Sequence, residues 1–306
     1  MLKVPHRTSI SSHIETLAGA AVVATNPVAG GDICVSTRAR LSDGRSVFVK
    51  SRPGIPDDFF AAEARGLAWL AEAQRETDAE TVRTPVLLGY NRECLVLEWV
   101  ESGRPSAEAA EELGRALAET HRVGAPRFGA QRDGYAGMLP LPNTQSDDWC
   151  EFFAVQRIEP YLRAAFNRGN LEAEDANSVV AVLERLGDLA GPAEPPARIH
   201  GDLWSGNVIW ATDGVPRLVD PAAHGGHREA DLAMLGLFGA PYVDRLVAAY
   251  HEVFPLADGW RDRQSLHQLH PLLVHAALFG GGYGARAGRA ARDLMSLRAN
   301  AASSTS

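Results

Sequence analysis

Long apolar runs, cysteine pairs and stretches of positive charge are all scarce in this chain of 306 residues. No apolar run approaches the roughly 20 residues that span a bilayer, and the longest one near the start, residues 17–24, follows Glu15 rather than a basic segment. The three cysteines, Cys34, Cys94 and Cys150, cannot close a disulfide framework and show no metal-ligand spacing. We therefore expect no membrane partner, and a reducing cytoplasm is the default compartment.

The charge balance excludes a further class of partner. Asp and Glu outnumber Lys and Arg by 38 to 30, which gives a net charge of -8 at pH 7. Without a basic stripe that could follow phosphates, nucleic acid is not expected as the main partner, and a small or cationic substrate fits better. Lysine is the scarcest cation, because only Lys3 and Lys50 occur. Lys50 ends the strand-like run SVFVK, which suggests that a compact point charge is needed there.

The most informative segment is residues 200–221, HGDLWSGNVIWATDGVPRLVDP. Asp202 follows a His-Gly pair, Asn207 comes five residues later, and Asp220 ends the next strand-like run. The runs VIWA and PRLVD flank a T-D-G-V turn, so they predict a hairpin that returns Asp220 beside Asn207. This is the spacing of a kinase catalytic loop and metal-binding strand.

Phosphoryl transfer requires these residue types. A carboxylate, here Asp202, accepts the proton of the attacking hydroxyl, while an amide oxygen and a second carboxylate, from Asn207 and Asp220, are suitable Mg²⁺ ligands. The segment therefore predicts an ATP- and Mg²⁺-dependent kinase. An ordinary acidic hairpin with turn-capping side chains is the simpler alternative.

Several further segments are candidates for the nucleotide site. Strands are expected over residues 33–41, 46–50, 86–90 and 94–100, and a helix over 57–73. The candidate ATP-binding residues are a glycine turn, a lysine with a glutamate to hold it, and a linker facing adenine: Gly30, Gly31, Asp32, Lys50, Glu63, Glu98, Trp99 and Val100. Glu63 could equally be a solvated helix residue, and the linker could be a connector only.

The rest of the chain predicts helices. They are expected over residues 9–24, 106–122, 147–168 with a kink at Pro160, 172–190, 228–239, 242–253 and 263–279. Asp231, at the start of one of them, is a candidate for holding the catalytic loop through backbone N–H groups, or for plain N-capping. His267, His270 and His275 share a helix, but no carboxylate or cysteine joins them at metal spacing, so we expect no zinc site.

The chain resembles the fructosamine kinase family, also called ketosamine-3-kinases, within the aminoglycoside phosphotransferase-like branch of the protein-kinase-like fold. The resemblance lies in HGDLWSGN, DPAAHGGHREADLAMLGLFG, NTQSDDWCEFFAVQRI, AAYHEVFPL and LFGGGYG. It implies an α+β fold of two lobes, with a five-stranded antiparallel sheet plus helix in residues 1–100 and a larger, mainly helical lobe in 101–306. It also implies ATP-dependent phosphorylation of the 3-hydroxyl of small or protein-bound ketosamines, which leads to deglycation.

The resemblance assigns roles to individual residues. It makes Asp202 the proton acceptor, Asn207 and Asp220 the Mg²⁺ ligands, and Trp204 and His200 the substrate-binding residues. Trp204 would pack on the sugar, although it could instead only wedge the loop onto the helices. Cys34 stands beside the glycine turn, so redox control of ATP binding is a hypothesis, with a buried small hydrophobe as the alternative.

Competing functions stay open at this stage. The chain could be a kinase for another small alcohol, such as an aminoglycoside or choline, or a nucleotide-binding pseudokinase that acts as a scaffold. The intact residues Asp202, Asn207, Asp220 and Lys50 argue against the scaffold. The sequence does not decide between a monomer and a homodimer.

Overall fold

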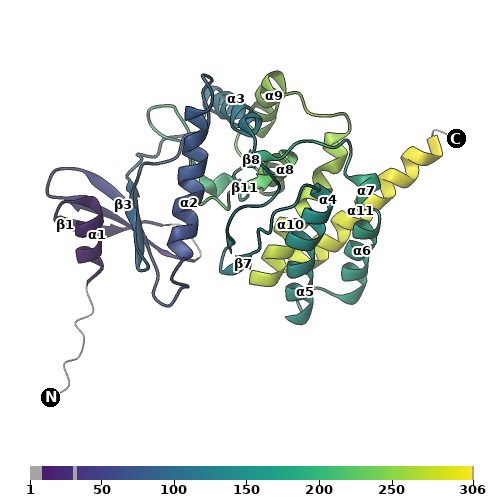
Figure 1. Ribbon diagram of the computed structural model, residues 1–306, viewed down its shortest axis with the longest axis horizontal. Coiled ribbons are helices and arrows are strands. Elements are labelled where there is room, and N and C mark those ends of the chain that lie inside the picture. Colours follow the sequence, from purple (N-terminus) through teal and green to yellow (C-terminus); the bar gives the residue numbers. More distant parts are fainter. Residues whose placement is uncertain (1–8, 30–32, 305–306) are drawn as a thin grey trace, which may run out of the picture.

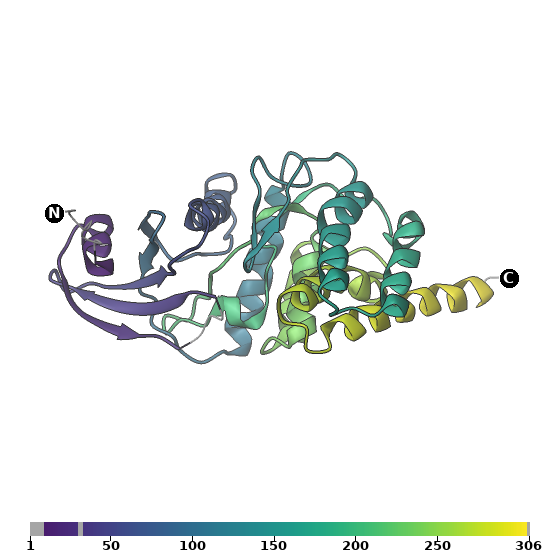
Figure 2. The ribbon, with the colours of Figure 1, turned by 90° about the horizontal axis from the view of Figure 1, so that it is seen from below.

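The computed structural model describes residues 9–29 and 33–304, with side chains up to residue 297. A sheet with helices α1 (Ile10–Ala18) and α2 (Phe59–Glu72) forms one end of the elongated molecule, and most other helices gather at the opposite end (Figure 1). The view from below shows the same division, with α11 (Tyr283–Ser304) running out to the far end (Figure 2). The domain boundary at residue 100 stays a prediction.

The sheet is antiparallel, with strand order β1-β2-β3-β5-β4. Its strands are β1 (Val22–Pro27), β2 (Val35–Leu41), β3 (Ser46–Ser51), β4 (Leu87–Tyr90) and β5 (Cys94–Glu98). Together with the helices, this sheet confirms the predicted α+β class and the five-stranded antiparallel sheet.

The predicted helix over 9–24 is wrong in its second half, because β1 begins at Val22. Gly19 takes the left-handed conformation, with φ 73°, and its N–H donates to the Glu15 carbonyl, which caps α1 at Ala18. Beyond the cap, the β-branched Val22 and Thr25 pair with β2, and the register shifts between Val22 and Ala24. The alanines of this stretch suggested a helix, but the glycine cap and the sheet decide the outcome.

The two helices of this end cover opposite faces of the sheet, as the alternation of strand side chains requires. On β5, Val96 packs in the cluster of Ile14 from α1, whereas Leu95 and Leu97 pack in the cluster of Phe60 from α2. Helix α2 is thereby fixed on the face of the sheet that looks toward the rest of the molecule (Figure 1).

The helices of the opposite end follow the predictions closely, with three differences. They are α3 (Ala107–Val123), α4 (Trp149–Phe152), α5 (Glu159–Asn167), α6 (Ala173–Glu184), α7 (Leu186–Leu189), α8 (Glu229–Phe238), α9 (Val243–Val253), α10 (Trp260–Phe279) and α11. A π-helical segment, Phe153–Ile158, replaces the expected kink at Pro160, and the helix over 172–190 is broken at Arg185. Helix α11 was not predicted.

Short elements connect these helices. They are the 3-10 turns Ala73–Arg75 and Ser205–Asn207 and the strands β6 (Gly134–Ala136), β7 (Leu139–Leu141), β8 (Ala197–Ile199), β9 (Val208–Ile209), β10 (Arg217–Leu218) and β11 (His224–Gly226). Isolated bridges from Arg83 to Arg217 and from Ser102 to Ala211 attach the first hundred residues and the following linker to the β9–β10 hairpin. The hairpin therefore lies where the sheet end meets the helical end.

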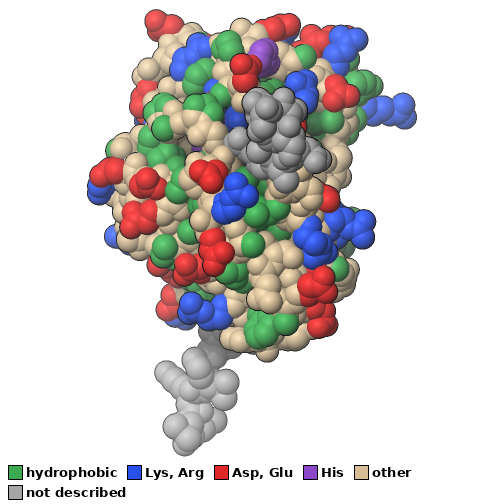
Figure 3. Space-filling view, turned by 90° about the vertical axis from the view of Figure 1, so that its right-hand side faces the viewer, with side chains coloured by type: hydrophobic (Ala, Val, Ile, Leu, Met, Phe, Trp, Pro, Cys, Tyr) green, Lys and Arg blue, Asp and Glu red, His purple; other side chains and the backbone are tan. Residues whose placement is uncertain are grey.

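The face of the molecule in Figure 3 carries charges of both signs. On the face in Figure 3, blue Lys and Arg side chains are interspersed with red Asp and Glu side chains rather than gathered in a stripe. Among the described residues, none of the helices combines the length and apolar character that crossing a membrane requires.

Candidate active site

The hairpin places the predicted metal ligands side by side. Strands β9 and β10 pair antiparallel, with Leu218 opposite Val208, and the Val219 N–H donates to the Asn207 carbonyl at 3.0 Å. Asp220 follows with φ 57°, a left-handed conformation that is uncommon for a residue with a side chain. The chain thus turns at Asp220 as it leaves the hairpin.

Asp202 lies against Asn207 in a partly buried position. The Asn207 side-chain amide donates to the Asp202 carbonyl at 2.8 Å and to its carboxylate at 3.1 Å. Burial raises the pKa of Asp202 to about 7, and the negative charge of Asp220 adds to the effect. A carboxyl group with a pKa in this range is well suited to accept a proton near neutral pH.

Lys50 joins the two ends of the molecule. Its ammonium contacts the Glu63 carboxylate at 2.8 Å and the Asp220 carboxylate at 2.9 Å, although Lys50 and Glu63 are both only 8% exposed. Burial favours the neutral amine, but the charges of Glu63 and Asp220 outweigh it and hold the pKa of Lys50 above its usual range. The lysine is therefore a fixed positive charge between α2 and the hairpin.

Asp231, on α8, binds the backbone at the start of the catalytic loop. Its carboxylate accepts the backbone N–H groups of His200 at 2.7 Å and Gly201 at 2.9 Å, and it contacts the His121 ring at 3.1 Å. These are the backbone contacts that were predicted for Asp231. Gly201 has φ 80°, and a Cβ there would lie 2.3 Å from the Ala222 carbonyl oxygen, so only glycine fits this turn.

His200 is buried at the start of the catalytic loop. It is 0% exposed, its Nε2 lies 2.9 Å from the Val219 carbonyl, and its Nδ1 accepts the Asp202 N–H at 3.3 Å. Burial lowers its pKa, which agrees with a neutral ring. With both ring nitrogens bound to backbone, His200 holds the loop against the segment that follows β10, and a contact with substrate stays a prediction.

A cavity of about 820 Å³ connects these residues. Its lining includes Lys50, Glu63, Glu98, Trp99, Val100, Asp202, Trp204, Asn207 and Asp220. The linker lies at the cavity wall, where the Glu98 N–H donates to the Val86 carbonyl at 2.9 Å and the Arg38 guanidinium stacks 4.3 Å from the Trp99 ring. One cavity thus reaches from the linker to the catalytic loop.

Trp204 extends from the catalytic loop into this cavity. It is 38% exposed, and its ring meets Phe238 edge to face at 6.1 Å. A Cβ at Gly206 would lie 2.3 Å from the Trp204 ring, so the glycine leaves room for the indole to fold over the loop. The ring both touches α8 and offers a free surface, so the two alternatives for Trp204 are compatible.

The remaining predicted residues are near the cavity or outside the described part of the chain. Gly30, Gly31 and Asp32 lie outside the described residues. Cys34 lines the cavity and packs with Ile33 and Phe48 beside the α2 cluster, and burial raises the pKa of its thiol. A raised pKa reduces the fraction of reactive thiolate. Together with the apolar contacts, this favours a packing role for Cys34 as a small hydrophobic side chain, and redox control stays a prediction.

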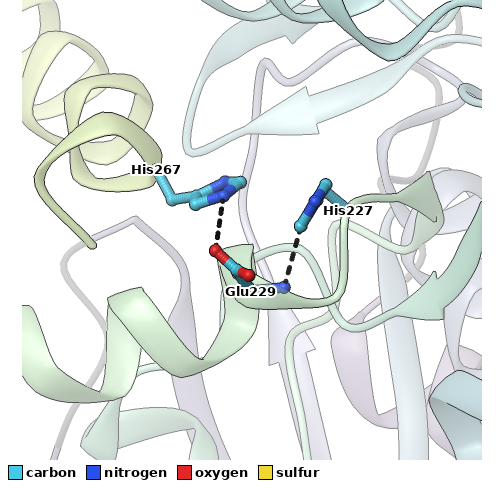
Figure 4. Close-up of side chains that lie close together, drawn as sticks. All are labelled: His227, Glu229 and His267. Atoms are coloured by element: carbon cyan, nitrogen blue, oxygen red, sulfur yellow. Dashed lines mark hydrogen bonds and ion pairs between the residues drawn. The ribbon is translucent and has the colours of Figure 1, made fainter. Parts of the chain in front are cut away.

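A second polar cluster lies apart from the catalytic loop, in the core of the helical end. His227, Glu229 and His267 are each less than 5% exposed, and their ligand atoms lie within 4.8 Å of one another (Figure 4). The spacing argument against a metal missed this group, because His227 and Glu229 come from a distant segment. Arg263 binds the Glu229 carboxylate at 2.6 and 3.0 Å, however, and His227 Nδ1 already accepts the Glu229 N–H at 3.2 Å. A cation here would meet the guanidinium charge, so the group is better explained as a link between α8 and α10.

Comparison with known proteins decides the family. The model of the fructosamine kinase family matches residues 6–297. The chain belongs to this family. It is 37% identical over 265 residues to a probable ketoamine kinase of Enterococcus faecium, covering 85% of this chain and 91% of that protein.

Solved structures agree with the family assignment. The crystal structure of a fructosamine-3-kinase candidate from Thermobifida fusca is 48% identical, covers 94% of this chain and 98% of its own, and has a TM-score of 0.87. The choline kinase LicA from Streptococcus pneumoniae, at 15% identity and a TM-score of 0.59 over 94% of this chain and 98% of its own, shares the fold alone. The predicted protein-kinase-like fold is confirmed.

Sequence reasoning missed several residues around the site. His121 on α3 bridges Asp231 and the Tyr250 hydroxyl, and Arg157 is buried beside Asn143 and His224. Their partners lie between 14 and 129 residues away along the chain, so spacing gave no signal. The motif around Arg157 was recognised, but no role could be assigned to the arginine from it.

Proposed function

We propose that this protein is an ATP-dependent kinase that phosphorylates the 3-hydroxyl of ketosamines, the adducts of amines with reducing sugars. The observation that carries the proposal is the convergence of Lys50, Asp202 and Asp220 on one cavity from the two ends of the molecule. Membership of the fructosamine kinase family and the names of its relatives support the acceptor.

Each residue has a task in this proposal. Lys50, oriented by Glu63, contacts the phosphates of ATP, while Glu98, Trp99 and Val100 border the adenine. Asp202 accepts the proton of the acceptor hydroxyl, and Asp231 keeps the loop in place. The raised pKa of Asp202 supports its role, because a weakly acidic carboxyl group takes a proton more readily.

Asn207 and Asp220 fit the proposed magnesium ion. The amide nitrogen of Asn207 is used by Asp202, which leaves its oxygen, and one Asp220 oxygen is used by Lys50. A carboxylate and an amide oxygen on one cavity match the preference of Mg²⁺ for oxygen ligands. The bound ion would neutralise charge on the phosphate oxygens.

The acceptor is proposed to lie against Trp204, whose exposed indole gives a sugar ring a flat apolar surface. Phosphorylation on the 3-hydroxyl would yield an adduct that decomposes and frees the amine. The proposal includes protein-bound adducts as well as small ones, with the cytoplasm as compartment.

An acceptor panel tests the proposal. The protein is incubated with ATP, Mg²⁺ and, in parallel, ribulosamine, fructosamine, an aminoglycoside or choline, and ADP release is followed for the chain and for Asp202→Asn. We expect turnover with the ketosamines, loss of turnover with EDTA, recovery with added Mg²⁺, and turnover lowered by about 10²- to 10⁴-fold in the variant. Turnover confined to the aminoglycoside or to choline would overturn the acceptor assignment.

A further inference from the structure

One face of α10 borders the cavity beyond the catalytic loop. The lining residues from this helix include two histidines, His270 and His275, and the apolar Pro271, Val274, Leu278 and Phe279. His270 is half-buried, and its ring meets Tyr161 edge to face at 5.1 Å. The side chain is therefore held in place while it still reaches the cavity.

The hydrogen bonding of His270 fixes its tautomer. Its Nδ1 lies 2.8 Å from the backbone carbonyl of Arg157, in the π-helical segment. A carbonyl oxygen only accepts, so Nδ1 carries the proton. In the neutral ring, Nε2 is then a hydrogen-bond acceptor.

The surroundings keep this ring neutral. Burial, followed by the positive charge of Arg157 and by His275, lowers the pKa of His270 to about 3. Within the described residues, the His270 ring forms its hydrogen bond through Nδ1 and none through Nε2. The structure therefore presents an unused lone pair at the border of the cavity.

Aromatic contacts connect Trp204 to His275, which lies five residues after His270 on α10 and lines the same cavity. Trp204 contacts Phe238, and Phe238 contacts His275 on α10 at 5.0 Å between ring centroids. His275 is close enough to His270 to influence its charge. The lone pair of Nε2 would repel phosphate oxygens, so Nε2 is better suited to contact the ketosamine than ATP.

We propose that His270 Nε2 accepts a hydrogen bond from a hydroxyl group of the sugar part of the ketosamine, and that His270 is a specificity-determining residue. The inference rests on the proposed function, because it presupposes a sugar acceptor. A protonated amine is the other donor that a ketosamine offers. The nearby charge of Arg157 opposes a cation at this position, so the hydroxyl is favoured.

Two substitutions of similar chemistry test the residue. His270→Asn keeps a donor near the Arg157 carbonyl but does not reach the position of Nε2, whereas His270→Gln places an amide oxygen close to that position. We expect His270→Asn to raise KM for the ketosamine about three- to tenfold, the loss of one neutral hydrogen bond. His270→Gln should lie nearer to the unsubstituted protein, and KM for ATP should not change in either variant. Equal KM values for the ketosamine in all three proteins would overturn the inference.

Deoxy substrates identify the donor. Ketosamines that lack one hydroxyl other than the 3-hydroxyl are compared in the unsubstituted protein and in His270→Asn. For the paired hydroxyl, its removal should lower kcat/KM in the unsubstituted protein but not in the variant. A further analogue has an ether oxygen in place of the amine. If this analogue, and none of the deoxy analogues, lowers kcat/KM in the unsubstituted protein but not in His270→Asn, the partner of His270 is the ammonium group, and the hydroxyl assignment is overturned.

The failure of this inference differs from failure of the proposed function. If the unsubstituted protein phosphorylates no ketosamine, both fall. If it phosphorylates ketosamines and His270→Asn behaves identically with every analogue, only the role of His270 falls. Thermal unfolding of both variants shows whether a change in KM comes with a change in the fold.

Discussion

Two groups of ionisable side chains in this protein have opposite electrostatic character. The cavity cluster is Lys50, Glu63, Asp202 and Asp220, and the core cluster is His227, Glu229, Arg263 and His267. In the cavity cluster three carboxyl groups share one ammonium, and burial is the main reason that the pKa values of Glu63 and Asp202 rise to about 7. In the core cluster burial works against ionisation of Glu229, but His267 and Arg263 outweigh it and lower its pKa to about 2.

The difference separates a reactive site from a structural one. The core cluster has one carboxylate bound on both oxygens by one guanidinium, so it neither needs nor admits a further charge. The cavity cluster has an excess of carboxyl groups next to open space, so it can take up a proton or a cation. Substitutions should therefore affect catalysis in the first cluster and stability in the second.

The largest effect is expected for Asp202→Asn. Loss of the proton acceptor should lower kcat by about 10²- to 10⁴-fold, while the melting temperature should stay equal or rise, because a desolvated carboxyl group beside Asp220 is removed. ADP release and thermal unfolding measure the two quantities. Full ATP turnover in this variant would remove Asp202 from its proposed role.

Arg263→Met should have the reverse profile. It leaves the Glu229 carboxylate buried without its guanidinium partner and with His267 3.4 Å away, which is expected to cost about 3–5 kcal/mol of unfolding free energy, while kcat per folded molecule stays unchanged. Urea denaturation gives the cost, and Arg83→Met, in an exposed ion pair with Glu80, is the control, with a loss of about 1 kcal/mol at most. A large loss of kcat in Arg263→Met would erase the distinction between the clusters.

Lys50→Met should lower kcat/KM for ATP by about 10²- to 10³-fold, the range for removing one preorganised charge that stabilises the transition state. Its effect on stability should be smaller than that of Arg263→Met, since Glu63 can take up a proton in place of the lost ammonium. Steady-state kinetics and urea denaturation of both variants test this. If Lys50→Met unfolds as readily as Arg263→Met, the lysine is structural.

The last prediction concerns a gradual change of kcat/KM and of the unfolding free energy with pH. Because the pKa of Asp202 is raised to about 7, the protonated, inactive form gains below that pH, and kcat/KM should fall about tenfold per unit. The same raised pKa favours folding at low pH, and this contribution is lost as the pH rises through 7. Urea denaturation at pH 5 and pH 8 should show a larger loss in the unsubstituted protein than in Asp202→Asn, which keeps only the similar contribution of Glu63. A flat activity profile between pH 5 and 8 would contradict the assignment.

The spacing of residues along the sequence determined the catalytic hairpin and most of the strands and helices. The offsets among Asp202, Asn207 and Asp220 fix a hairpin, because a short turn between two strands leaves few registers, and the structure shows that hairpin. Four of the five sheet strands and most helices also follow from local periodicity. The unpredicted β1 depended on pairing with a neighbouring strand, which periodicity does not contain.

Only the tertiary structure decided which distant side chains meet. Lys50 contacts Asp220, His121 contacts Asp231, and His270 contacts Arg157, each through the packing of separate elements. The same packing buried His200, and it paired Glu229 with Arg263 in the core. Sequence spacing specifies residues within one turn or hairpin, whereas burial, charge balance and tautomer depend on neighbours that the folded chain brings from far away.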